Sequence, residues 1–148
     1  MTISEKDFIC PCGCGRGKVD PALIEGLNKL QSETGIDFII TSGARCEKRN
    51  AADGGAKASF HLTTDAQPCR AADIQNVKDE STETAKRLFF AAIKIFKGVG
   101  LYKGLKFPFL HVDTRTIPAF WYRGVKYNYF KNPETCWGEF KKFYEVKK

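Results

Sequence analysis

The sequence contains two histidines, and each is followed by a carboxylate that could share its chemistry. His61 is followed by Asp73, and His111 stands two residues before Asp113. Two imidazoles and one carboxylate are the ligand types of a catalytic zinc, whose fourth position stays open for water. Side chains two residues apart on a strand point to the same face, so His111 and Asp113 can both face one site. The alternative is a pair of structural histidines satisfied by backbone hydrogen bonds, and the residue types alone leave both interpretations open.

Cysteines form a second group of residues that could bind metal: Cys10, Cys12, Cys14, Cys46, Cys69 and Cys136. The first three lie within five residues and could join Cys46 or Cys69 around a structural zinc. Their C-x-C-x-C spacing is tighter than the common C-x-x-C pattern, so it favours unliganded thiols in a tight N-terminal loop. The start of the sequence shows no basic-then-apolar signal segment, so we expect free thiols rather than disulfides.

Composition narrows the classes of protein that could position these residues. The chain has 148 residues, of which 43% are hydrophobic, which fits one domain with a real core and excludes wholesale disorder. No apolar run approaches the roughly 20 residues of a membrane helix, so we expect no membrane insertion. The lack of a signal segment at the start of the sequence predicts a cytoplasmic location at synthesis. A formal net charge of +7 predicts an anionic partner. The basic residues are dispersed and form no recognised nucleic-acid motif, so a specific nucleic-acid partner is not expected.

Helices are predicted where apolar residues recur at helical spacing behind a capping residue. Asp20-Pro21 begins one helix, which Gly35 ends, and Ser81 caps another whose apolar stripe reaches Phe96 before Gly98 closes it. A short third helix is predicted over residues 134–144. Residues 1–19 and 46–72 are expected to be irregular.

Strands are predicted between these helices. The expected strands cover residues 36–40, taken as buried, then 72–74, 99–102 and 109–113, with further β structure over 120–129. Helices that are separated from clustered strands indicate an α+β fold rather than alternating βαβ units. We therefore expect a small central antiparallel sheet flanked by helices.

A set of short motifs follows one another along the chain in a fixed order. They are Ser42-Gly43-Ala44-Arg45, Asn50, Gly54-Gly55, Ser59-Phe60-His61, Ala71-Ala72-Asp73, Gly100-Leu101-Tyr102 and His111-Val112-Asp113. No single motif is specific, but their order is. The ordered set resembles the family of zinc D-alanyl-D-alanine carboxypeptidases and L-alanyl-D-glutamate endopeptidases, which includes phage endolysins. The resemblance spans about residues 8–123, within a single domain over 1–148, and leaves 124–148 as a C-terminal extension.

The resemblance implies a zinc peptidase that hydrolyses an amide bond in the stem peptides of bacterial peptidoglycan. It implies Zn2+ held by His61, Asp73 and His111. It also implies that Arg45 holds or polarises a substrate carbonyl or carboxylate, with Ser59 adding a hydrogen bond. The lack of a signal segment fits either a phage lysin that a holin releases to the cell wall or a bacterial cytoplasmic dipeptidase. We expect the lysin, acting as a monomer, because +7 suits an anionic wall polymer.

Two departures from the family pattern affect the site. The step from His61 to Asp73 contains Thr64–Pro68 as an apparent insertion, which makes Asp65 a rival ligand. Pro108 stands where some members of the family place a glutamate, so Asp113 is the best remaining general base. Asp113 could instead orient a ligand or Arg115. Because of these departures, an alternative function stays open. The chain could be a non-catalytic, zinc-binding relative that binds cell wall or serves as a structural module.

Aromatic residues near the end of the chain leave one further question open. Trp121, Tyr122 and Trp137 could either belong to the core or line a substrate groove.

Overall fold

A computed structural model describes residues 2–79 and 81–146, and its elements are a 3-10 turn, α-helices and strands. The helical elements are η1 (Glu5–Phe8), α1 (Pro21–Thr34), α2 (Glu47–Ala52), α3 (Thr82–Ala92) and α4 (Pro133–Glu145). The strands are β1 (Ile39–Ser42), β2 (Ala71–Gln75), β3 (Gly98–Tyr102), β4 (Phe109–Asp113), β5 (Ala119–Arg123) and β6 (Tyr127–Phe130).

The strands form one sheet in the order β1-β2-β4-β3-β5-β6. Every neighbouring pair is antiparallel except β3 and β5, which are parallel. This confirms the α+β class and changes the expected antiparallel sheet to a mixed one. The reason lies in the chain path, because β4 returns beside β3 and the next strand then adds to the opposite edge of β3.

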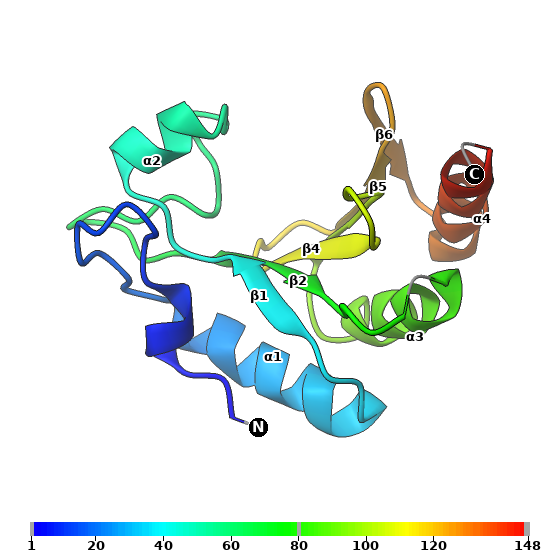
Figure 1. Ribbon diagram of the computed structural model, residues 1–148, viewed down its shortest axis with the longest axis horizontal. Coiled ribbons are helices and arrows are strands. Elements are labelled where there is room, and N and C mark those ends of the chain that lie inside the picture. Colours follow the sequence, from blue (N-terminus) through cyan, green and yellow to red (C-terminus); the bar gives the residue numbers. More distant parts are fainter. Residues whose placement is uncertain (1, 80, 147–148) are drawn as a thin grey trace.

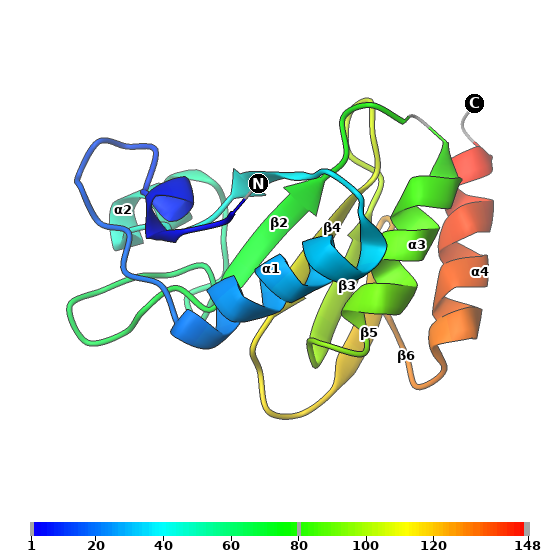
Figure 2. The same cartoon turned by 90° about the horizontal axis from the view of Figure 1, so that it is seen from below.

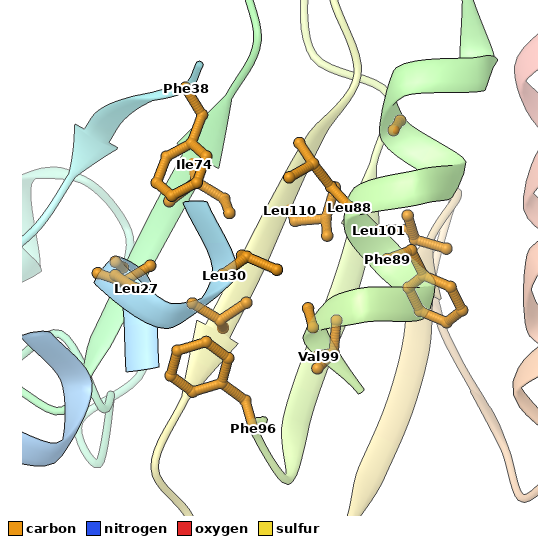
Figure 3. Close-up of a cluster of buried hydrophobic side chains, with 14 of the residues drawn as sticks. Leu27, Leu30, Phe38, Ile74, Leu88, Phe89, Phe96, Val99, Leu101 and Leu110 are labelled. Atoms are coloured by element: carbon orange, nitrogen blue, oxygen red, sulfur yellow. The ribbon is translucent and has the colours of Figure 1, made fainter. Parts of the chain in front are cut away.

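Three helices cover one face of this sheet. In Figure 1, α1 lies below β1 and β2, α3 lies beside the centre of the sheet, and α4 lies at the end formed by β5 and β6. Figure 2, seen from below, shows α1 in front of the sheet. Apolar side chains fill the space between helices and sheet, and Leu30, Leu88 and Leu110 are among those that Figure 3 shows. Burial of this apolar surface is the main force that holds the layers together.

The other face of the sheet carries the polar residues of the candidate site. Side chains alternate between faces along a strand, so the buried Ile74 and Leu110 on the helix side leave Asp73 and His111 on the opposite side. Strand register then places Asp73 beside His111, His111 beside Gly100, and Gly100 beside Trp121. One row across four strands therefore brings together residues that are up to 48 positions apart in the sequence.

The local signals for α1 act as the sequence predicts. The Asp20 side chain accepts a hydrogen bond from the backbone N–H of Ala22, Pro21 is the first helical residue, and Gly35 ends the helix in the left-handed conformation. A residue with a Cβ would be strained at the φ of 66° that Gly35 adopts.

Three predicted elements need correction. The strand predicted over 36–40 begins only at Ile39, and it lies at the edge of the sheet, where it is partly exposed. The buried residues of the predicted strand, Ile36 and Phe38, reach the core from the segment before β1. The predicted loop over 46–72 contains α2, a helix too short to show a clear apolar period. Helix α3 ends at Ala92, so Phe96 enters the core from a turn.

The C-terminal extension adds β6 and α4 to the same sheet and core, where Phe140 is fully buried. Across residues 2–79 and 81–146, no helix is long and apolar enough to cross a membrane.

Candidate active site

Three predicted ligands converge on the face of the sheet opposite the helices. Asp73 Oδ1 lies 3.3 Å from His61 Nε2 and 3.2 Å from His111 Nδ1, and the three ligand atoms lie within 4.8 Å of one another. In a tetrahedral zinc site with bonds of about 2.0–2.1 Å, neighbouring ligand atoms are separated by about 3.3 Å. The donor set and its spacing therefore fit a zinc ion.

His61 is held by the segment that follows β1. Its Nδ1–H donates to the carbonyl oxygen of Gly43 at 2.9 Å, which fixes the tautomer and turns Nε2 toward Asp73. The backbone N–H of Arg45 donates to the carbonyl of His61 at 2.9 Å, so the two segments lie side by side. The His61 residue is only 4% exposed, which keeps its imidazole in one orientation.

His111 is held from behind by a carboxylate and an arginine. Its Nε2–H donates to Asp113 Oδ2 at 2.8 Å, and Arg115 donates to both oxygens of the same carboxylate at 2.8 and 2.7 Å. Asp113 is fully buried. The arrangement matches the carboxylate–histidine support that orients metal ligands, and it leaves Nδ1 of His111 for the metal.

This arrangement does not suit Asp113 as the predicted general base. Burial alone would raise the pKa of Asp113, but the hydrogen bonds from Arg115 and His111 outweigh it and hold that pKa well below its usual range. A base of such low pKa holds a proton poorly, and both of its oxygens are already engaged. The geometry instead fits the alternative role of orienting His111 and Arg115.

Asp73 stays ionised although it is largely shielded from solvent, with its side chain 14% exposed. Burial alone would raise the pKa of Asp73, and the hydrogen bonds and charges of His111 and His61 reverse this and keep it well below its usual range. The same contacts act on His111, where burial lowers the pKa but hydrogen bonds to Asp113 and Asp73 raise it overall. The site thus presents a carboxylate rather than a carboxylic acid to a metal ion.

Arg45 lies at the edge of the three ligands. Its guanidinium forms an ion pair with Asp73 Oδ2 at 3.8 Å. It also donates a hydrogen bond to Ser42 Oγ at 3.1 Å and contacts Asn50 Oδ1 at 3.5 Å. Asn50 also donates to the carbonyl of Ala56 at 2.8 Å, which folds the glycine-containing loop around the arginine. The motif residues before and after Arg45 therefore serve to hold one cation beside the site.

Ser59 and the inserted loop lie around His61 without joining the ligands. Ser59 Oγ accepts a hydrogen bond from the backbone N–H of His61 at 3.2 Å, so it shapes the turn, and its contact with substrate stays a prediction. The rival ligand Asp65 pairs with Arg16 at 3.0 Å, and its side chain is 96% exposed. The insertion closes on itself through a hydrogen bond from Thr64 N to Gln67 O at 2.8 Å.

Two features of the site were not predicted. Trp121 packs against His111, with ring centroids 5.4 Å apart, and Gly100 between them leaves room because a Cβ there would collide with the indole. Arg115 lies between the rings of Phe60 and Trp121, with its guanidinium carbon 4.9 Å from each centroid. The alternation of side chains between the two faces of the strand after Pro118 is the signal that would have placed Trp121 on the same face as His111.

The other two aromatic residues belong to the opposite side of the molecule. Tyr122 packs against Phe130 and Phe143, while Trp137 is buried against Phe89. They form core contacts with α3 and α4, so only Trp121 of the three lies at the site.

Two imidazoles and a carboxylate on an α+β sheet, with an arginine beside them, define the kind of site that zinc-dependent hydrolases use. The model of the family described as Peptidase M15 matches residues 1–113, a span that includes both histidines and Asp73. The chain therefore belongs to the Peptidase M15 family, whose members are zinc-dependent metallopeptidases. No curated protein and no solved structure matches the chain.

Proposed function

We propose that this metallopeptidase hydrolyses an amide bond in the stem peptides of bacterial peptidoglycan, with Zn2+ held by His61, Asp73 and His111. The observation that carries the proposal is the convergence of these three ligand atoms at separations of 3.2 and 3.3 Å. Family membership supports the reaction class. The guanidinium of Arg45 beside the site supports a substrate that carries negative charge.

In this proposal the residues of the chain orient the groups at the site, and the metal activates water and the scissile carbonyl. When bound, zinc supplies a water of lowered pKa and polarises the scissile carbonyl. His61 Nε2 and His111 Nδ1 are presented by hydrogen bonds at their other ring nitrogens, to Gly43 O and to Asp113. Because these supports are already formed, binding of the metal requires little rearrangement of the imidazoles.

Arg45 supplies a fixed positive charge beside the reacting bond. Its side chain is 15% exposed, so the guanidinium is partly shielded from water while its edge stays reachable. A preorganised cation of this kind stabilises oxyanion charge, or holds a free carboxylate of a stem peptide. Ser59 could add a hydrogen bond to the same substrate through its hydroxyl hydrogen, because its oxygen already accepts from His61.

A lysin that acts on the cell wall is the setting we propose, with a holin as the partner for release and the monomer as the active form. The net charge of +7 supports this, because it attracts the anionic polymers of a bacterial wall. A single domain over residues 1–148 is part of the same proposal.

The test is digestion of purified peptidoglycan by the zinc-loaded protein, followed by mass spectrometry of the released peptides. We expect new amino and carboxyl termini within the stem peptide, and their position identifies a carboxypeptidase or an endopeptidase. The His111→Ala variant should release nothing. The control Arg87→Ala changes an exposed arginine on α3, on the helix-covered face, and should match the wild type.

A protein that binds zinc and wall peptide yet releases no product under any condition would reject the proposal. It would favour the alternative, a non-catalytic module that binds the cell wall. The engagement of Asp113 by Arg115 and His111 is the observation that keeps this alternative worth testing.

A further inference from the structure

Four cysteines outside the active site gather at one place, and we call them the thiol cluster: Cys10, Cys12, Cys14 and Cys46. Their sulfur atoms all lie within 4.8 Å of one another. The sulfur of Cys12 is 3.5 Å from that of Cys10 and 3.6 Å from that of Cys46. Three of the thiols come from the loop after η1, and the fourth comes from the residue that caps α2.

These separations match those of a metal-bound set of thiolates. With zinc–sulfur bonds of about 2.3 Å, two sulfurs of a tetrahedral site are separated by about 3.8 Å. We propose that the thiol cluster binds a second zinc ion, as a closed structural site of four thiolates distinct from the active site. The tight C-x-C-x-C spacing on its own favours free thiols, because the sequence does not show that Cys46 supplies the fourth sulfur.

The backbone of the loop is shaped to present its thiols to one point. Gly13, between Cys12 and Cys14, and Gly15, directly after Cys14, adopt φ values of 83° and 80°, a left-handed conformation that turns the chain on either side of Cys14. The backbone N–H of Cys10 donates to the carbonyl of Arg16 at 2.7 Å, which closes the loop. Cys10, Cys12 and Cys14 are thereby brought to the side where Cys46 lies.

Backbone hydrogen bonds and nearby cations suit sulfurs that carry negative charge. The N–H of Cys46 donates to the sulfur of Cys10, and the N–H of Arg49 donates to the sulfur of Cys46, both at 3.4 Å. Arg16 and Lys48 line the surface hollow beside the cluster together with Glu47, and Arg16 also pairs with Asp65. A zinc ion with four thiolates carries a net negative charge, which these donors and cations would stabilise.

The two remaining cysteines are buried in the core, apart from the thiol cluster. Cys69 is fully buried and donates to the carbonyl of Ala71, and burial raises the pKa of its thiol to about 11. Cys136 lies within α4 and is fully buried in the core, and burial raises the pKa of its thiol to about 12. Neither belongs to the thiol cluster, and Cys136 serves as a control in the test below.

A metal at the thiol cluster would fasten the N-terminal loop to the segment that carries the active-site arginine. Cys46 directly follows Arg45, and the backbone N–H of Ala44 donates to the carbonyl of Phe8 at 2.9 Å. Gly43, whose carbonyl orients His61, belongs to the same segment. The second zinc would therefore act as a positioning element for Arg45 and His61 without touching substrate.

The test uses the full chain, purified without added metal and then loaded with Co2+ in place of zinc. We expect about two metal ions per chain and a thiolate-to-cobalt charge-transfer absorption. The His61→Ala variant should keep that absorption and lose one metal ion. The double variant Cys12→Ser/Cys14→Ser should lose the absorption and keep the ion at the active site, whereas Cys136→Ala should match the wild type. Cys12 and Cys14 are exposed, so their exchange for serine leaves the core intact.

A second measurement needs no variant. Exposed free thiols react at once with a thiol reagent, so Cys12 and Cys14 should react slowly in the purified protein and rapidly after a strong chelator is added. A wild-type protein without charge-transfer absorption, a double variant with unchanged metal content, or disulfides among the four cysteines by mass spectrometry would each overturn the proposal.

Discussion

The chemistry of His111 depends on which of its two ring nitrogens carries the proton. Asp113 accepts from Nε2, and Arg115 neutralises Asp113 from the other side, so Nδ1 is the nitrogen that faces Asp73. His61 reaches the same result with a different partner, because Gly43 O accepts from its Nδ1 and leaves Nε2 toward the site. The supports behind the ligands thus decide how the ligands face the metal.

The substitution Asp113→Asn tests this support. We expect zinc affinity to fall by about 10- to 100-fold, because the amide loses the charge that orients His111 and leaves Arg115 unpaired. Competition with a chelator measures the change. The matched control Asp65→Asn removes the same charge from an exposed side chain and should leave affinity unchanged. Full zinc affinity with a large loss of kcat would return Asp113 to the role of general base.

The substitution Arg45→Ala tests the positive charge at the site. We expect kcat/KM for a stem peptide to fall by about 100-fold or more, since a preorganised cation would be lost from the reacting bond. Zinc content should stay the same because Arg45 supplies no ligand atom. An active variant, or one that has lost its zinc, would contradict this assignment.

At the scale of elements, the sheet sets the site by register. Asp73, His111, Gly100 and Trp121 occupy one row on four adjacent strands. Gly100 is the member of the row without a side chain, and the Trp121 ring occupies the space that a Cβ would need.

The substitution Gly100→Ala should therefore lower the free energy of unfolding by about 1–3 kcal/mol, because the indole must move within a packed row. Gly138→Ala is the matched control. A Cβ at Gly138 would meet no neighbouring atom, and alanine within helix α4 should raise stability by about 0.5–1 kcal/mol. Chemical denaturation measures both. Equal effects at the two positions would show that packing against Trp121 is not tight.

Hydrogen bonds at the start of helix α3 predict that the stability of the folded state depends on pH. The Thr84 hydroxyl and the Ser81 hydrogen bonds lower the pKa of Asp79 to about 2, so its carboxylate stabilises the folded state above about pH 4. That stability should be lost as the pH falls from about 4 to about 2. Thr84→Val should raise the pKa of Asp79 toward its ordinary value, which NMR titration of its carboxyl group can follow. An unchanged pKa in this variant would exclude the hydroxyl as the cause.

The sequence predicts the elements with strong periodicity and caps, such as the helix from Asp20-Pro21 to Gly35. It fails where tertiary contacts decide the outcome. Ile36 and Phe38 are apolar because they reach the core ahead of the strand, so hydrophobicity alone misplaces the start of β1. The parallel pairing of β3 with β5 depends on the path of the chain, which no local pattern records.

The candidate site shows the same division. The order of the motifs is enough to select His61, Asp73 and His111, which the structure brings together. It cannot choose between base and support for Asp113, because that depends on Arg115 and on burial. The convergence of Cys46 with the N-terminal thiols likewise depends on the fold, since 32 positions separate Cys46 from Cys14.

At the scale of the whole molecule, the two groups of side chains that could bind metal lie at different places. The candidate ligands His61, Asp73 and His111 lie on the face of the sheet opposite the helices, and the thiol cluster lies beside the segment that follows β1. The first group would perform chemistry, while the second would hold the loop that surrounds it. The net charge of +7 supports attraction of an anionic wall polymer to the molecule.

The most direct measurement of the central claim is a zinc titration of chelator-stripped protein, with hydrolysis of a peptidoglycan stem peptide as the signal. We predict no hydrolysis before zinc is added, a rise to a plateau as zinc binds, and no rise at any zinc concentration for His61→Ala. Full activity in the stripped protein, or full activity of His61→Ala, would contradict a zinc peptidase centred on His61, Asp73 and His111.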